Sequence, residues 1–151
     1  MAQVIVTAER EVAGSVEQVR AALADYVNTR PKILTTHFSD YSVRSGGHGA
    51  GSQVRWKLAP TEKRVRDQLM NVTEPGDGSL VESDANSSMV TTWTVRPARD
   101  GHSTVGVRTT WNGASGIGGF FERIFAPMVL RRIYIEMLDK LDGELGHGAA
   151  G

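Results

Sequence analysis

The stretch that decides the fold is residues 113–145, GASGIGGFFERIFAPMVLRRIYIEMLDKLDGEL. A glycine-rich start runs into a long apolar segment, in which apolar residues recur at the three- and four-residue spacing of a helix. They form two overlapping series: Ile117, Phe121, Ile124, Phe125, Met128, Ile135 and Leu138, and then Leu130, Tyr134, Met137, Leu141 and Leu145. This spacing predicts a terminal helix with a wide apolar face, which could close a solid core or cover a cavity.

Pro127 interrupts this apolar segment. Proline has no backbone N–H to donate to the preceding turn, so the helix is expected to bend at Pro127 or to begin there. The glycines within residues 116–119 could form the hinge of a lid, and a tight connection between a strand and the helix explains them equally well.

Most of the chain before this helix is predicted to be β-strand. The clearest alternation is in residues 52–58, where Val54, Trp56 and Leu58 share one face and polar residues share the other. The remaining predicted strands are residues 3–12, 38–45, 63–74, 79–85, 88–97 and a last strand that includes 105–111. Short turn sequences separate several of them, among them Asn86-Ser87.

The phase of residues 63–74 is open at this stage. If Met70 and Val72 point inward, so does Gln68, whereas the opposite phase buries Val65 and Leu69. A bulge could accommodate both.

Two short elements lie between the first and second strands. Ser15 followed by Gln18 has the spacing of a capping box and predicts a helix over about residues 16–25. Pro31 interrupts the next segment, so residues 28–36 are expected to be a loop or a short second helix. The complete order predicts an α+β domain over residues 1–146, in which helices cover one face of a curved antiparallel sheet, followed by a flexible tail at 147–151.

Composition excludes several classes of function. The 151 residues include 17 basic and 17 acidic side chains, and this zero net charge argues against a nucleic-acid partner. No apolar run approaches the ~20 residues needed to span a bilayer, so no integral membrane association and a cytoplasmic location are expected. Cysteine is absent and no histidine pair has helical ligand spacing, so we expect no metal and no cofactor.

The element order and two stretches of sequence resemble the START-like superfamily, also called SRPBCC or Bet v 1-like. The stretches are residues 31–51, with their glycine-rich loop, and residues 118–127, and both look like the bacterial polyketide cyclase/dehydrase and lipid-transport branch. The resemblance implies a helix-grip fold, with a seven-stranded curved antiparallel sheet wrapped around the long C-terminal helix. It also implies a cavity between sheet and helix that holds lipids, polyketides or other apolar molecules, and in a minority of members catalyses cyclisation or dehydration.

Aromatic and apolar residues on several strands and on the helix are candidates for lining such a cavity. The predicted ligand-binding set is Trp56, Trp93, Val107, Thr109, Trp111, Phe121, Phe125 and Met128. Tryptophan can bury a large area and orient a flat ligand, and methionine adapts to irregular shapes. The alternative is that these residues are ordinary core.

Three residues form a weak candidate acid/base set. His37 could transfer protons at neutral pH, and Tyr41 could donate a hydrogen bond to an enolate or ketone oxygen. Arg66 could bind a carboxylate or carbonyl if the phase that buries Gln68 is correct. The alternatives are a buried, satisfied histidine and a solvated arginine.

These features lead to three hypotheses about function. The first is a small-molecule binding or transport protein whose partner is an apolar ligand. The second is a cyclase/dehydrase-like enzyme, which requires at least two of His37, Tyr41 and Arg66 to converge in one cavity. The third is a protein-interaction module or chaperone cofactor, and the chain could be a monomer or a homodimer.

Overall fold

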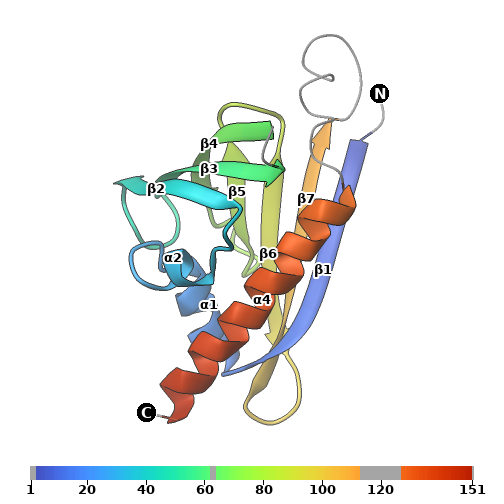
Figure 1. The fold of residues 1–151 in the computed structure, drawn as a ribbon. Helices are drawn as coiled ribbons and strands as arrows, with labels where there is room; N and C mark the ends of the chain where they lie inside the picture. Colours follow the sequence, from blue (N-terminus) through green and yellow to red (C-terminus); the bar gives the residue numbers. More distant parts are fainter. Residues whose placement is uncertain (1–2, 62–63, 113–126, 151) are drawn as a thin grey trace.

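The computed structural model describes residues 3–61, 64–112 and 127–150 of the chain. A curved sheet wraps around one long helix, and two short helices close one end of the space between them (Figure 1). In chain order the elements are β1 (Gln3–Ala13), α1 (Val16–Ala24), α2 (Thr29–Ile33), β2 (Phe38–Ser45), β3 (Gln53–Thr61), β4 (Arg64–Thr73), β5 (Leu80–Asp84), β6 (Val90–Pro97), β7 (His102–Asn112) and α4 (Pro127–Ala150).

The sheet has seven strands in the order β1-β7-β6-β5-β4-β3-β2, and every neighbouring pair is antiparallel. Strands β2 to β7 follow one another as a meander, and β1 pairs with β7. The helices α1 and α2 therefore carry the chain from one edge strand, β1, to the other edge strand, β2. The predicted α+β helix-grip architecture is confirmed.

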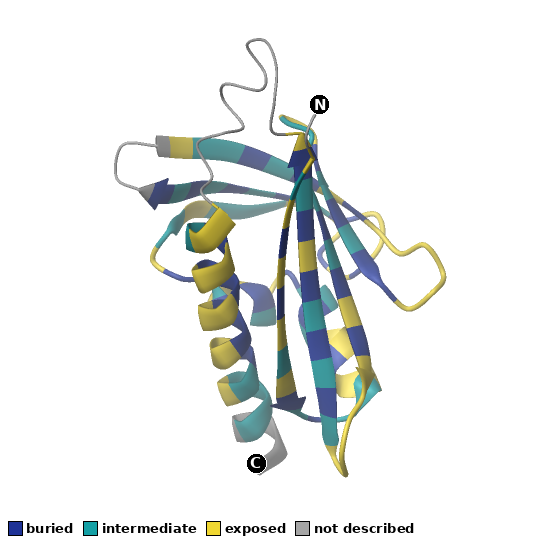
Figure 2. Ribbon diagram, turned by 90° about the vertical axis from the view of Figure 1, so that its right-hand side faces the viewer, coloured by how far each residue is buried: buried dark blue, intermediate teal, exposed yellow. Residues whose placement is uncertain are grey.

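Buried residues alternate with more exposed ones along the strands (Figure 2), and most of the buried ones are apolar. In β7 the buried residues are Ser103, Val105, Val107, Thr109 and Trp111, every second position. The sequence left open which face of β4 points inward. In the structure Gln68, Met70 and Val72 are buried, and Val65 is 54% exposed.

The capping box at the start of α1 is present as predicted. Gln18 N–H donates to Ser15 Oγ, and Ser15 N–H donates to Gln18 Oε1. The following segment is a short helix, α2, which tolerates Pro31 because the first turn of a helix has no intrahelical partner for its N–H groups. The helix α2 buries Arg30 and Ile33, so it delivers a charged side chain to the interior.

The glycine-rich loop between β2 and β3 is hydrogen-bonded to the end of α1 and to the segment that connects α1 to α2. Tyr26 N–H donates to Gly47 O at 2.9 Å, and Gly49 N–H donates to Ala24 O at 3.0 Å. Gly46 has a φ of 67°, and a Cβ atom there would lie 2.8 Å from the Cα of Ser52. Glycine is therefore required by both conformation and close backbone approach.

The long helix α4 buries one side against the sheet. Its buried residues are Leu130, Ile133, Tyr134, Met137, Leu138 and Leu141. Met128 is 70% exposed and Ile135 is 44% exposed, so the interior position expected for Met128 is wrong. The physical reason is that the series containing Leu130 and Tyr134 faces the sheet. The helix begins at Pro127 and continues to Ala150, where the sequence predicted a flexible tail from residue 147.

Side chains of α4 also hold the free edge of β1. Asp142 Oδ1 accepts the backbone N–H of Ala13 at 2.8 Å, and Arg131 Nε donates to the backbone oxygen of Thr7 at 3.2 Å. Arg10 forms ion pairs with Asp139 and Asp142. These contacts fix α4 along β1, at the edge of the concave face.

Candidate ligand-binding site

A small cavity lies between the sheet and α4, and we call the space around it the interior. Its walls include aromatic rings and thioethers from the sheet and α4, together with four polar side chains. The rings are Phe38, Trp56, Trp93 and Tyr134, the thioethers are Met70, Met89 and Met137, and the polar groups are Arg30, Gln68, Glu82 and Thr91. The free volume is about 20 Å³, room for about one water molecule. Within the described residues the interior is therefore largely filled.

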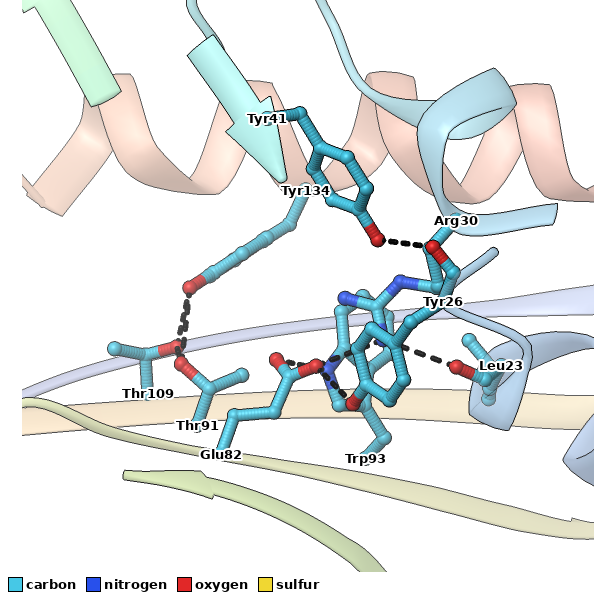
Figure 3. A network of polar contacts seen from close by, with 9 residues as sticks. All are labelled: Leu23, Tyr26, Arg30, Tyr41, Glu82, Thr91, Trp93, Thr109 and Tyr134. Atoms are coloured by element: carbon cyan, nitrogen blue, oxygen red, sulfur yellow. Dashed lines mark hydrogen bonds and ion pairs between the residues drawn. The ribbon is translucent and has the colours of Figure 1, made fainter. Parts of the chain in front are cut away.

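Glu82, on β5, is the centre of a buried polar network (Figure 3). Its Oε2 accepts from Tyr26 Oη at 2.6 Å and from Arg30 at 2.8 Å, and its Oε1 accepts from Trp93 Nε1 at 2.9 Å. Glu82 and Arg30 are each only 2% exposed. Burial of a carboxylate is tolerated when charge and hydrogen bonds compensate it, and here three donors do so.

Arg30 is held between two rings as well as by Glu82. Its guanidinium carbon lies 4.9 Å from the ring centroids of both Tyr26 and Trp93, and it donates to Leu23 O at 3.1 Å. Burial is the largest single influence and would lower the pKa of Arg30, but the charge and hydrogen bond of Glu82, together with Tyr26 and Tyr41, outweigh it, and the pKa rises. Its Nε has no hydrogen-bond partner among the described residues.

Three hydroxyl groups satisfy one another on the α4 side of the interior. Thr91 and Thr109 lie 2.8 Å apart through their Oγ1 atoms, and Tyr134 Oη contacts Thr109 and lies 3.4 Å from Thr91. Each of the three hydroxyl groups therefore contacts the other two. Burial raises the pKa of Tyr134 to about 12, although the two threonine hydroxyls act in the opposite direction.

Gln68, on β4, has a different environment. Trp56 Nε1 donates to its Oε1 at 2.9 Å, and its Nε2 donates to Met89 Sδ at 3.1 Å. The two residues Trp56 and Gln68 are direct partners in the β3–β4 ladder. Gln68 therefore faces the cavity from a rigid strand, with one hydrogen bond to a strong donor and one to a weak acceptor.

The predicted ligand-binding residues fall into four groups. Trp56 and Trp93 line the cavity. Val107, Thr109 and Trp111 are buried on the inner face of β7 without being among the residues that line it. Met128 is exposed, as described above, and the predicted pair Phe121 and Phe125 lies outside the described residues.

The predicted acid/base set does not converge on the cavity. His37 Nδ1 lies 2.8 Å from Thr35 Oγ1, and Tyr41 Oη donates to the backbone oxygen of Tyr26 at 2.5 Å. Arg66 is half-buried, on the same face of β4 as Gln68. None of His37, Tyr41 and Arg66 is among the described residues that line the cavity, so the geometric condition for an enzyme that uses them is not met.

The sequence analysis missed Glu82 and Arg30. A usable signal existed for Glu82, because a hairpin folded symmetrically about Asn86-Ser87 places Glu82 opposite Thr91, and this is the observed pairing. Thr91 belongs to the face that also carries Trp93, so Glu82 had to point inward. No comparable local signal identifies Arg30. Its burial can be predicted only when it is known that a carboxylate is buried nearby.

A larger groove lies on the outer face of β1, β7 and β6. It has a volume of about 390 Å³, and Gly106 leaves the space between Thr94, Arg108 and Glu9. The groove is open, six of its nine lining residues are polar or charged, and the Glu9 carboxylate in it is paired with Arg96 at 2.9 Å. The interior, with buried rings and oriented donors, fits a small ligand better.

Two possible features are not found in the part of the chain that the structure describes. No group of three or more His, Asp or Glu side chains there could hold a metal ion. Among the described helices, none is both long enough and apolar enough to cross a membrane.

The fold and the site together define a START-like protein, in which a sheet grips a C-terminal helix and encloses a mixed aromatic and polar interior. The family model for polyketide cyclase / dehydrase and lipid transport proteins matches residues 3–146. The chain belongs to this family.

A solved structure is similar to the chain over nearly its whole length. The NMR solution structure of the KanY protein has 46% sequence identity and a TM-score of 0.86, over 97% of this chain and 99% of that chain. A search of curated proteins found no match.

More distant structures share the fold alone. The Zhui aromatase/cyclase from Streptomyces sp. R1128 has 14% identity and a TM-score of 0.76, over 96% of this chain and 94% of that chain. A START superfamily protein from Mycobacterium smegmatis has 11% identity and a TM-score of 0.70, over 95% and 97% of the two chains.

Proposed function

We propose that the protein binds a small apolar molecule, a lipid, a polyketide or another compound of this kind, in the interior between the sheet and α4. The observation that carries this proposal is the cavity lined by Phe38, Trp56 and Trp93. Family membership supports it, because the family model describes polyketide cyclase / dehydrase and lipid transport proteins.

The present volume of about 20 Å³ requires the interior to open when a ligand enters. Three of the lining residues can move to make room. These are Met70, Met89 and Met137, whose unbranched side chains have three rotatable bonds each. The sheet and the Glu82 network stay fixed in this view, and the thioethers move. A ligand thus binds by displacing methionine side chains from a preformed frame.

The test is whether the protein carries or takes up an apolar molecule. Native mass spectrometry and solvent extraction of the purified protein identify a retained ligand, and thermal unfolding with a panel of fatty acids and aromatic compounds identifies added ones. We expect at least one compound to raise the Tm. If the protein carries nothing and no compound raises the Tm, the proposal is wrong.

A pair of variants locates the binding. Leu34 lines the cavity, so Leu34→Trp should fill it and abolish the rise in Tm. Val65 is exposed on the outer face of β4, so Val65→Trp adds the same side chain outside the interior and should leave ligand binding unchanged. Equal effects of the two variants would place the ligand elsewhere.

A further inference from the structure

Two polar side chains of the cavity have incomplete hydrogen bonding: Arg30, whose Nε has no partner among the described residues, and Gln68, whose amide has a weak one. The Gln68 side chain is 1% exposed, and its amide has two N–H donors. The acceptor that the structure shows for them, within the described residues, is Met89 Sδ at 3.1 Å. A thioether is a weak acceptor. A buried donor is therefore left without a strong partner, in a place where such groups are normally satisfied.

The orientation of this amide follows from its other contact. An indole nitrogen can only donate, so the oxygen of Gln68 must face Trp56 Nε1, 2.9 Å away. The NH₂ group consequently faces Met89. Gln68 and Met89 both line the cavity, so this contact between the amide and the thioether lies in the cavity wall.

The charges around the cavity favour an uncharged ligand. The charge of Arg30 is balanced by Glu82 at 2.8 Å, and Glu82 also accepts from two neutral donors. A ligand carboxylate would add a buried charge without a counterion of its own, which is costly. A neutral oxygen needs only a donor, and Gln68 provides one.

We propose that Gln68 recognises the carbonyl oxygen of an uncharged, flat ligand in this cavity, an inference that rests on the proposed function above. The carbonyl oxygen replaces Met89 Sδ as the acceptor of the Gln68 amide, and the flexible Met89 side chain moves aside. Phe38 and Trp56 line the same cavity and meet edge to face, with ring centroids 5.9 Å apart and ring planes at 82°.

Three probes with one ring system separate the possibilities. They are 2-acetylnaphthalene, which has a carbonyl group, 2-ethylnaphthalene, which lacks it, and 2-naphthoate, which is charged. Dissociation constants are measured by NMR titration of the full chain. We expect the ketone to bind about tenfold more tightly than the hydrocarbon, the effect of one buried hydrogen bond, and the naphthoate to bind most weakly.

Variants assign the preference to one side chain. Gln68→Met has similar volume and no N–H donor, so the ketone should lose its tenfold advantage over the hydrocarbon. Gln53 is the matched control, because its amide bonds to Asn71 and does not line the cavity, and Gln53→Met should preserve the preference. If Gln68→Met does not fold, the Gln68 side-chain amide resonances of the natural protein decide: they should shift with the ketone and not with the hydrocarbon.

The outcomes separate this inference from the proposed function. Equal binding of ketone and hydrocarbon, or tightest binding of the naphthoate, overturns the role of Gln68 and leaves small-molecule binding intact. Failure of all three probes, with no ligand found in the wider panel, overturns both.

Discussion

Glu82 and Gln68 lie on neighbouring strands and face the same cavity, yet their surroundings differ. Glu82 accepts three hydrogen bonds from strong donors, one of them charged. Gln68 has one strong partner, Trp56, and one weak one, Met89. A saturated buried group has nothing left to offer a ligand, whereas an unsaturated one does. The comparison assigns Glu82 to the frame of the interior and Gln68 to recognition.

The largest effect is expected when Glu82, the residue with three strong hydrogen-bond donors, is replaced. Glu82→Leu leaves Arg30 buried without a counterion, and we expect a loss of about 3–5 kcal/mol in the free energy of unfolding. The double variant Arg30→Met/Glu82→Leu removes both charges and should recover only part of that loss, because Tyr26 and Trp93 still lack their acceptor. Denaturant unfolding of the three proteins measures this. A loss below about 1 kcal/mol in the single variant would show that Glu82 is not part of the frame.

High pH should destabilise the same region. All three tyrosines of the chain have a raised pKa: burial is the main cause in each, and it raises the pKa of Tyr41 and of Tyr134 to about 12. A phenol with a raised pKa favours the neutral form in the folded state. The contribution of such a phenol to the free energy of unfolding is complete below the pKa of tyrosine in the unfolded state, near 10. This contribution is lost as the pH rises towards 12.

Two measurements check this expectation. Tyrosinate absorbance at 295 nm should stay small near pH 10 in the folded protein and be about half complete at that pH in denaturant. Stability should fall between about pH 10 and 12, by up to about 2–3 kcal/mol for Tyr134 alone. Normal titration of any of the tyrosines in the folded state would contradict its burial in the network.

A smaller effect is expected in the hydroxyl cluster. Tyr134→Phe removes one hydroxyl and leaves Thr91 and Thr109 bonded to each other at 2.8 Å. Because both remaining groups keep a partner, the loss should be about 1 kcal/mol in denaturant unfolding. A loss as large as that of Glu82→Leu would mean that this cluster, too, belongs to the frame.

The smallest effect is expected when Met89, the weak acceptor of the Gln68 amide, is replaced. Met89→Leu keeps the volume and removes only a weak acceptor, so the loss should stay below about 1.5 kcal/mol. The same unfolding experiment measures it. A loss comparable to that of Glu82→Leu would mean that the thioether contact stabilises the fold, and the contrast between Gln68 and Glu82 would then disappear.

The fold could be predicted from local pattern because strands and the terminal helix bury one face each. Alternation placed Val107 and Trp93 on inner faces, and the Ser15 and Gln18 pair located the start of α1. The rotation of α4 could not be settled in this way. Two overlapping apolar series competed, and only packing on the sheet decided against Met128.

The site was less predictable for a different reason. A search for cavity walls selects large apolar residues, and it found Trp56 and Trp93. The polar members of the interior look like surface residues in the sequence, because Glu82 lies in a short strand and Arg30 next to a proline. Their burial depends on each other over 52 residues of sequence separation, which no local pattern records.

The contacts between α4 and β1 have a consequence for association between chains. An edge strand presents unpaired backbone groups to which a strand of another molecule can add. On β1, Asp142 occupies the N–H of Ala13 and Arg131 occupies the oxygen of Thr7. The helix that completes the interior thereby also blocks two docking points for a foreign strand, so loosening α4 would expose a template for aggregation as well as open the cavity.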